Sequence, residues 1–147
     1  MAKVILLFAS MSGNTEMMAD AVSEGIQEVG ATVDSIDIMF GYEAEKLKEY
    51  DGIIFGAYTW GDGELPDDFL DLYEDLDTVE LTGMKVAVFG SCDSSYEKYG
   101  AAVDLLVKKL SDRGAEVFTE GLKIELTPDE AEEEVCRTFG RDFIAFL

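Results

Sequence analysis

Short apolar runs alternate with segments of helical periodicity along the whole chain, and this alternation limits the folds open to it. Strands are predicted over residues 4–9, 32–38, 52–57, 86–90 and 116–126. Helical spacing of apolar residues predicts four helices, carried by Met18, Val22, Ile26 and Val29; by Phe69, Leu72, Tyr73 and Leu76; by Val103, Leu106, Val107 and Leu110; and by Ala131, Val135, Phe139 and Phe143. A short helical turn is predicted over residues 45–50. Strands that alternate with helices indicate a parallel sheet with crossover connections.

The order of the strands follows from which apolar runs carry charged residues. Runs 4–9, 52–57 and 86–90 are apolar throughout, as expected of central strands that are buried on both faces. Runs 32–38 and 116–126 include charged side chains, as sheet edges do. This pattern favours an α/β fold whose five-stranded parallel sheet has the order 2-1-3-4-5. Ligands of such sheets bind beyond the carboxyl ends of the strands, where the order reverses between strands 1 and 3.

Length and charge exclude several classes of partner. The 147 residues predict one domain over residues 1–147. A formal net charge of -21, with no histidine, repels nucleic acids and anionic membranes and favours encounter with basic protein surfaces. The first apolar run is too short to span a bilayer, and the two cysteines show no metal-like spacing, so a reducing cytoplasm is the expected location. A monomer is expected, since nothing in the sequence calls for more.

The loop after the first predicted strand indicates a phosphate site. It comprises Ser10, Met11, Ser12, Gly13, Asn14 and Thr15 and leads directly into a predicted helix. Hydroxyls, an amide and backbone N–H groups at a helix N-terminus can bind a phosphate without a basic residue. The loop lacks the Gly-Lys-Ser/Thr ending of a nucleotide triphosphatase, so it suits a single phosphomonoester. The structural alternative is that Ser and Thr only cap the helix and Gly13 only turns the chain.

Two further loops place aromatic residues at the same predicted edge of the sheet. The first contains Tyr58, Thr59, Trp60, Gly61 and Asp62, and its tryptophan is a candidate surface for stacking on a planar ring. The second loop contributes Ser91, Cys92, Asp93, Tyr96, Tyr99 and Gly100. Two rings from separate strand ends can enclose one flat cofactor. Taken alone, Trp60 could instead fill the core beneath its loop, and Tyr96 and Tyr99 could instead pack against the following helix.

The combination of S-M-S-G-N-T, Y-T-W-G-D-G-E-L-P and S-C-D-S-S-Y resembles the short-chain flavodoxins, most closely those of bacilli. The resemblance covers nearly the whole chain and implies a flavodoxin-like three-layer sandwich with helices on both faces. It implies that residues 10–15 bind the phosphate of FMN and that Thr59, Trp60 and Gly61 border one face of the flavin. Tyr96 would stack on the other face, and Asp93 with its neighbours would offer backbone N–H groups. Lys98 and Gly100 depart from the residues of many relatives.

The resemblance implies a one-electron carrier that cycles between a neutral semiquinone and an anionic hydroquinone. Six carboxylates that lie in the two aromatic loops or directly follow the first of them are expected to disfavour the anion and lower its potential: Asp62, Glu64, Asp67, Asp68, Asp93 and Glu97. Expected partners are basic-surfaced redox proteins, such as an NADPH-dependent flavodoxin reductase, and electron-accepting enzymes.

Two other functions stay open on the sequence. An FMN-dependent enzyme or flavin-sensing regulator keeps the cofactor, although the chain has no histidine as an obvious general acid or base. A phosphoacceptor signalling domain shares the strand order, but resemblance to that class requires acidic residues after the first and third strands. Ser10 and Tyr58 stand near those positions instead.

Overall fold

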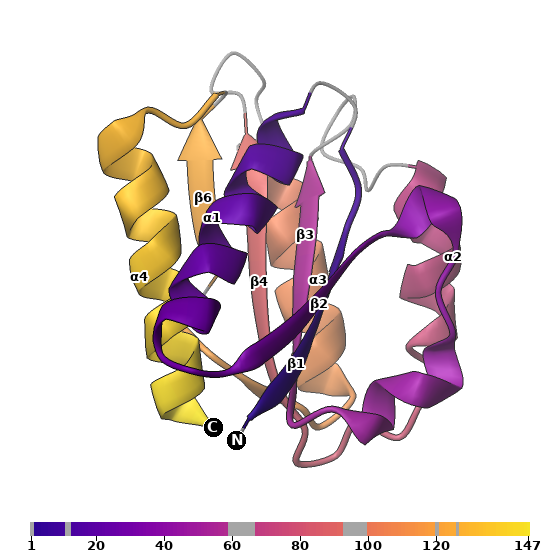
Figure 1. Ribbon diagram of the computed structural model, residues 1–147. Helices are drawn as coiled ribbons and strands as arrows, with labels where there is room; N and C mark the ends of the chain where they lie inside the picture. Colours follow the sequence, from indigo (N-terminus) through magenta and orange to yellow (C-terminus); the bar gives the residue numbers. More distant parts are fainter. Residues whose placement is uncertain (1, 11–12, 59–66, 93–99, 120, 126) are drawn as a thin grey trace.

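The computed structural model describes residues 2–10, 13–58, 67–92, 100–119, 121–125 and 127–147, which form a parallel sheet between two layers of helices (Figure 1). In chain order the elements are β1 (Lys3–Phe8), α1 (Asn14–Glu28), β2 (Thr32–Asp37), the 3-10 helices η1 (Ile38–Phe40) and η2 (Ala44–Glu49), β3 (Gly52–Tyr58), α2 (Asp67–Asp75), β4 (Lys85–Cys92), α3 (Ala101–Asp112), β5 (Glu116–Val117), β6 (Leu122–Glu125) and α4 (Glu130–Phe146).

The strand order is β2-β1-β3-β4-β5, all paired in parallel, which confirms the predicted order. The central strands β1, β3 and β4 are buried along nearly their whole length, whereas every residue of β2 keeps some exposure. Burial on both faces explains why the central runs carry almost no charge. The switch between β1 and β3 therefore lies where the sequence predicts it.

The predicted last strand, 116–126, is wrong as one continuous element. Both β5 and β6 pair with β4. Val86 and Phe89 of β4 are three positions apart, but their partners, Val117 and Leu122, are five positions apart. The two segments are therefore separate strands. Thr119, which follows β5 by two residues, has a positive φ of 58°, a conformation that a β-branched residue rarely adopts.

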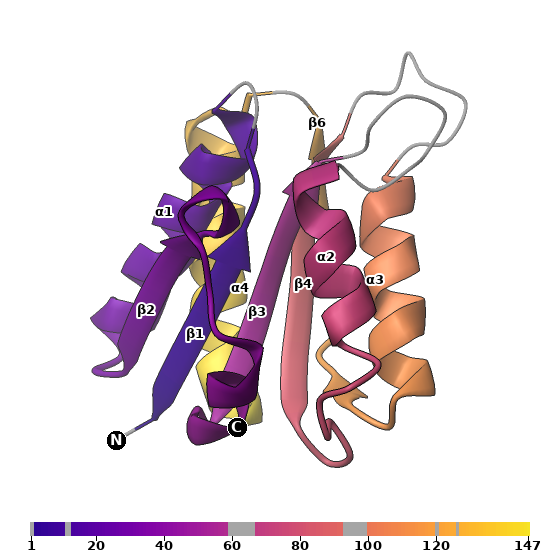
Figure 2. The same ribbon diagram turned by 90° about the vertical axis from the view of Figure 1, so that its right-hand side faces the viewer.

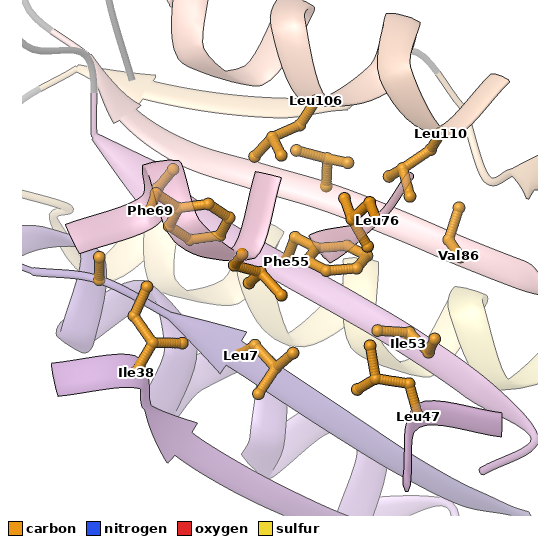
Figure 3. Close-up of a cluster of buried hydrophobic side chains, with 14 of the residues drawn as sticks. Leu7, Ile38, Leu47, Ile53, Phe55, Phe69, Leu76, Val86, Leu106 and Leu110 are labelled. Carbon is orange, nitrogen blue, oxygen red and sulfur yellow. The ribbon is translucent and has the colours of Figure 1, made fainter. Parts of the chain in front are cut away.

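The sheet separates two buried cores. On one face, α1 and α4 cover Val4, Leu6, Ile54 and Phe89. On the other, α2 and α3 cover a cluster that includes Leu7, Ile53, Phe55, Phe69 and Leu106 (Figures 2 and 3). Alternate residues of each central strand point to opposite faces, so one strand supplies both cores. Burial of this apolar surface is the main favourable term in folding.

Two helix faces differ from the prediction. Val29 lies beyond the end of α1 and is 48% exposed, and Val135 of α4 is 47% exposed. Ala131 is exposed as well. The buried stripe of α4 comprises Cys136, Phe139, Gly140 and Phe143. The residues predicted to face the core on α4 are spaced four apart, and such a set drifts around a helix of 3.6 residues per turn. Its first two members, Ala131 and Val135, therefore lie outside the core.

Helices α1 and α4 lie side by side and approach closely at two glycines (Figure 1). A Cβ atom on Gly25 would collide with the carbonyl oxygen of Arg137, and one on Gly140 would collide with that of Val22. Both contacts involve backbone, which cannot move aside as a side chain can. Glycine is therefore required at both positions for this helix pair to pack.

Among the described residues, no helix is long and apolar enough to cross a bilayer.

Candidate cofactor site

The carboxyl ends of the three central strands meet at one edge of the sheet, which is also where α1 begins (Figure 1). Phe8 at the end of β1 pairs with Gly56 of β3, and Tyr58 at the end of β3 pairs with Ser91 of β4. The backbone N–H of Ala9 donates to the carbonyl of Gly56 at 3.0 Å, which extends the ladder one residue past β1. The three predicted loops therefore begin close to one another, at the residues where the structure describes their starts.

The N-terminus of α1 is organised around Ser10 and Gly13. Gly13 is the N-cap, with a left-handed φ of 90°, and it has no side chain that could accept a hydrogen bond. The Ser10 hydroxyl oxygen accepts from the N–H of Gly13 at 3.1 Å and from the N–H of Glu16 at 3.3 Å. Among the residues that the structure describes, no atom beyond the chain neighbours would lie within 4 Å of a Cβ on Gly13. The helix thus presents N–H groups and its positive dipole end without a covering side chain at the cap.

Thr15 and Ser91 join α1 to β4 through their hydroxyls. Their oxygen atoms are 2.8 Å apart, and the two residues are only 1% and 7% exposed. The sequence assigns Ser91 and Cys92 to the third loop, and this boundary is wrong because β4 continues to Cys92. The Ser91 side chain faces α1 because alternate residues of β4 share a face, and Ala87 and Phe89 pack in the α1–α4 core.

Asn14 makes a second connection, to a residue that the sequence does not single out. The Thr127 hydroxyl, in the segment between β6 and α4, donates to the side-chain oxygen of Asn14 at 2.8 Å. The two residues lie 113 positions apart in the chain. No local pattern marks Thr127, so only the tertiary fold reveals that it orients the Asn14 amide.

Cys92 and Gly100 have structural roles near this edge. Burial raises the pKa of the Cys92 thiol to about 11, so it stays protonated at neutral pH and is a poor nucleophile. Gly100 is the N-cap of α3 with a positive φ of 67°, and a Cβ there would press on the aliphatic part of Lys123. Lys123 forms an ion pair with Asp104 at 2.9 Å.

Of the other predicted site residues, Tyr58 is half-buried at the end of β3. The remaining ones lie outside the described residues, so their predicted contacts stay predictions: Met11, Ser12, Thr59, Trp60, Gly61, Asp62, Asp93, Tyr96 and Tyr99.

The described part of the cradle fits a phosphomonoester. Its donors are the backbone N–H groups of the first turn of α1 and the hydroxyls of Ser10 and Thr15, all of them uncharged. The dipole of a helix N-terminus favours an anion at this point. Glu16, the acidic residue of the first turn, is exposed to solvent. Within the described ranges, no three His, Cys, Asp or Glu residues are grouped so as to hold a metal ion.

A phosphate cradle at the switch point of a 2-1-3-4-5 sheet is typical of the class of α/β proteins that bind flavin mononucleotide. The flavodoxin family model matches residues 6–140. Probable flavodoxin 2 of Bacillus subtilis is 48% identical over 97% of this chain and 95% of its own length. The crystal structure of oxidised flavodoxin 1 from Bacillus cereus superimposes with a TM-score of 0.95 at 57% identity, covering 99% of each chain.

The chain therefore belongs to the flavodoxin family. Members of this family are FMN-binding flavoproteins of electron transport, and the predicted cofactor and class of protein are confirmed at this level. A further relative, the flavodoxin of Nitratidesulfovibrio vulgaris, is 39% identical over 96% of this chain and 97% of its own length.

Proposed function

We propose that this chain is a low-potential one-electron carrier that holds FMN without a covalent bond and has no substrate turnover of its own. The observation that carries the proposal is the neutral cradle at the start of α1, where Gly13 leaves the helix end open and two hydroxyls lie beside it. Such a site binds a phosphate through hydrogen bonds and a helix dipole, with no basic residue needed.

Each predicted site residue has a place in this proposal. Residues 10–15 bind the phosphate, and Tyr58, Thr59, Trp60, Gly61 and Asp62 border one face of the flavin ring. Tyr96 stacks on the other face, with Tyr99 and Gly100 beyond it. Asp93, together with Ser91 and Cys92 before it, forms the edge that offers backbone N–H groups to the ring. The segment 1–147 acts as one FMN-binding unit.

Bound FMN supplies the redox chemistry, and we propose that its working pair is the neutral semiquinone and the anionic hydroquinone. The chain contributes by making negative charge at the ring unfavourable. Asp62, Glu64, Asp67, Asp68, Asp93 and Glu97 all belong to the segments that would surround the ring. A carboxylate about 10 Å from the new charge costs it ~1.7 kcal/mol at an effective dielectric of about 20, before screening by salt.

Stepwise reduction of the FMN-loaded protein, followed by absorption spectroscopy, tests the proposal. We expect a yellow protein that turns blue after one electron and is bleached after the second, with the second couple at low potential. Each carboxylate changed to an amide should raise the potential of the second couple. The increases should add when the changes are combined. A protein that stays colourless with added FMN would overturn the cofactor assignment, and unchanged potentials in the amide variants would overturn the electrostatic part.

The charge of the chain supports the proposed partners. Basic-surfaced redox proteins, such as an NADPH-dependent flavodoxin reductase and electron-accepting enzymes, would be attracted by the net charge of -21. The carrier would work as a monomer in the cytoplasm. Rates of electron transfer with such partners should fall as salt rises, because salt screens long-range attraction.

A further inference from the structure

The buried hydroxyl pair of Thr15 and Ser91 connects the two ends of the proposed site. Thr15 is the polar first member of the buried stripe of α1, which continues through Met18, Ala19 and Val22. Ser91 is the last residue but one of β4, which ends at Cys92. The pair therefore links the phosphate-binding end of α1 to the strand that leads to the ring-binding loop.

The direction of this hydrogen bond determines what Thr15 can offer to an anion. Each hydroxyl carries one hydrogen, and with their oxygens 2.8 Å apart either residue can be the donor. If Thr15 donates to Ser91, the Thr15 oxygen presents only lone pairs to the helix end, and an anion there is repelled. If Ser91 donates instead, the Thr15 hydrogen is free to donate to the anion.

We propose that Ser91 is a positioning residue that donates to the Thr15 hydroxyl oxygen and so directs the Thr15 hydrogen to the FMN phosphate. Ser91 thereby contributes to the preference for phosphorylated over unphosphorylated flavin without touching the phosphate. This inference rests on the proposed function, because it requires the phosphate to lie at the start of α1.

Burial makes the orientation effective. Both side chains are almost fully excluded from solvent, so water competes little for their hydrogen-bonding positions. Hydrogen bonds in such surroundings are strengthened electrostatically, and each polarises the next one in a chain. A Ser91–Thr15–phosphate chain would therefore bind the anion more tightly than Thr15 alone, whose hydroxyl would rotate among several acceptors.

The test measures FMN and riboflavin affinities of the full-length protein by quenching of flavin fluorescence. Ser91→Ala should weaken FMN about 3- to 10-fold, the loss expected for one hydrogen bond between uncharged groups, while riboflavin changes by less than about 2-fold. Thr15→Val should weaken FMN at least as much. Adding Ser91→Ala to Thr15→Val should cause no further loss, because Ser91 acts through the Thr15 hydroxyl.

Three further variants separate positioning from a general effect on α1 or on packing. Thr15→Ser keeps the hydroxyl and should keep the preference for FMN. Ser23→Ala removes another hydroxyl of the same helix, one whose buried oxygen has no hydrogen-bond partner within the described part of the chain, and should leave both affinities unchanged. Ser91→Cys keeps a side chain of similar size with a weaker donor, and should fall between wild type and Ser91→Ala if the alanine variant packs poorly.

Three results would overturn the inference while leaving the proposed function intact. They are an equal loss of FMN and riboflavin affinity in Ser91→Ala, no loss of either, or a further loss when Ser91→Ala is added to Thr15→Val. Wild-type protein that fails to bind FMN would instead refute the proposed function itself. Urea unfolding of each apoprotein verifies that the variants are folded.

Discussion

Helices α1 and α4 pack side by side on the same face of the sheet, yet their N-termini are built in opposite ways (Figure 1). At α4, the Asp129 side chain accepts from the N–H of Glu132 at 2.8 Å, and the Glu132 carboxylate accepts from the N–H of Asp129 at 3.2 Å. This capping box satisfies the helix end from within its own sequence. At α1, the cap is Gly13, and no side chain at that position accepts a hydrogen bond.

The contrast shows what a helix end needs in order to bind an anion. Three acidic residues, Glu130, Glu132 and Glu133, surround the start of α4 and would repel a phosphate. The start of α1 has one, Glu16, and is flanked by the hydroxyls of Ser10 and Thr15. Helix dipoles of the same direction can therefore serve different roles, structural at α4 and, as we propose, phosphate-binding at α1.

The largest expected effect comes from giving α1 a carboxylate cap like that of α4. Gly13→Asp should weaken FMN by at least about 100-fold relative to Gly13→Asn, because a carboxylate within a few ångströms of the phosphate repels it. Both side chains are similar in size, would meet no atom of the described residues within 4 Å at their Cβ, and share the strain of the positive φ, so the difference isolates charge. FMN titration measures it. Equal affinities of the two variants would place the phosphate elsewhere.

The next effect concerns the packing that holds the two helices together. Gly25→Ala should lower the free energy of unfolding by about 2 kcal/mol, because the added methyl group collides with the backbone of Arg137. Gly140→Ala should act in the same way against Val22. Val29→Ala, at an exposed position, is the control and should change stability by less than about 0.5 kcal/mol. Urea unfolding measures these free energies. A Gly25→Ala protein as stable as the control would contradict the close approach of α1 to α4.

Removing the α4 cap should cost stability and spare the cofactor. Asp129→Ala is expected to lower the free energy of unfolding by about 1 kcal/mol, the usual loss for an N-cap, with FMN affinity unchanged within about 2-fold. Asp129→Asn, which still offers an acceptor oxygen, should lose less. Weaker FMN binding in Asp129→Ala, measured on folded protein, would mean that the two helix ends are not independent.

The smallest effect is a pH dependence located in α4. Burial, with the carboxylates of Glu132 and Glu133 adding to it, raises the pKa of the Cys136 thiol to about 12 from an ordinary value near 9. A raised pKa means stability that is complete below pH 9 and is lost as pH rises from 9 toward 12. By pH 9.5 the loss should reach roughly 0.8 kcal/mol, and it then grows by at most about 1.4 kcal/mol per pH unit.

Cys136→Ala removes this titration and should unfold with a flatter pH profile between pH 8 and 10 than the wild type. Urea unfolding at each pH gives the comparison. Identical slopes for the two proteins would show that the thiol does not contribute to the pH dependence.

The sequence predicts the parts of the fold that depend on local pattern. Apolar runs such as 52–57 must be buried on both faces, so their positions in the chain suffice to locate the central strands and the switch point. The break between β5 and β6 is missed, because Thr119 adopts a positive φ that β-branched residues disfavour and no local pattern marks it. The tilt of the buried stripe on α4 is missed for a similar reason, since neighbouring α1 decides which residues are covered.

The candidate site likewise has residues that the sequence predicts and contacts that it does not. Ser10, Gly13 and Thr15 are predictable because they are adjacent in the chain and directly precede or begin a helix. Hydrogen-bond partners from distant segments are not predictable. Ser91, the partner of Thr15, is 76 residues away in the chain, and Thr127, the partner of Asn14, is 113 residues away. Their positions follow from how β4 and the start of α4 are placed against α1.

A crystal structure of the protein with FMN bound tests the central claim most directly. The account predicts the phosphate at the open end of α1, accepting hydrogen bonds from first-turn N–H groups and from the Thr15 hydroxyl, with no lysine or arginine in contact. A phosphate bound by a basic side chain, or located away from Gly13, would contradict it.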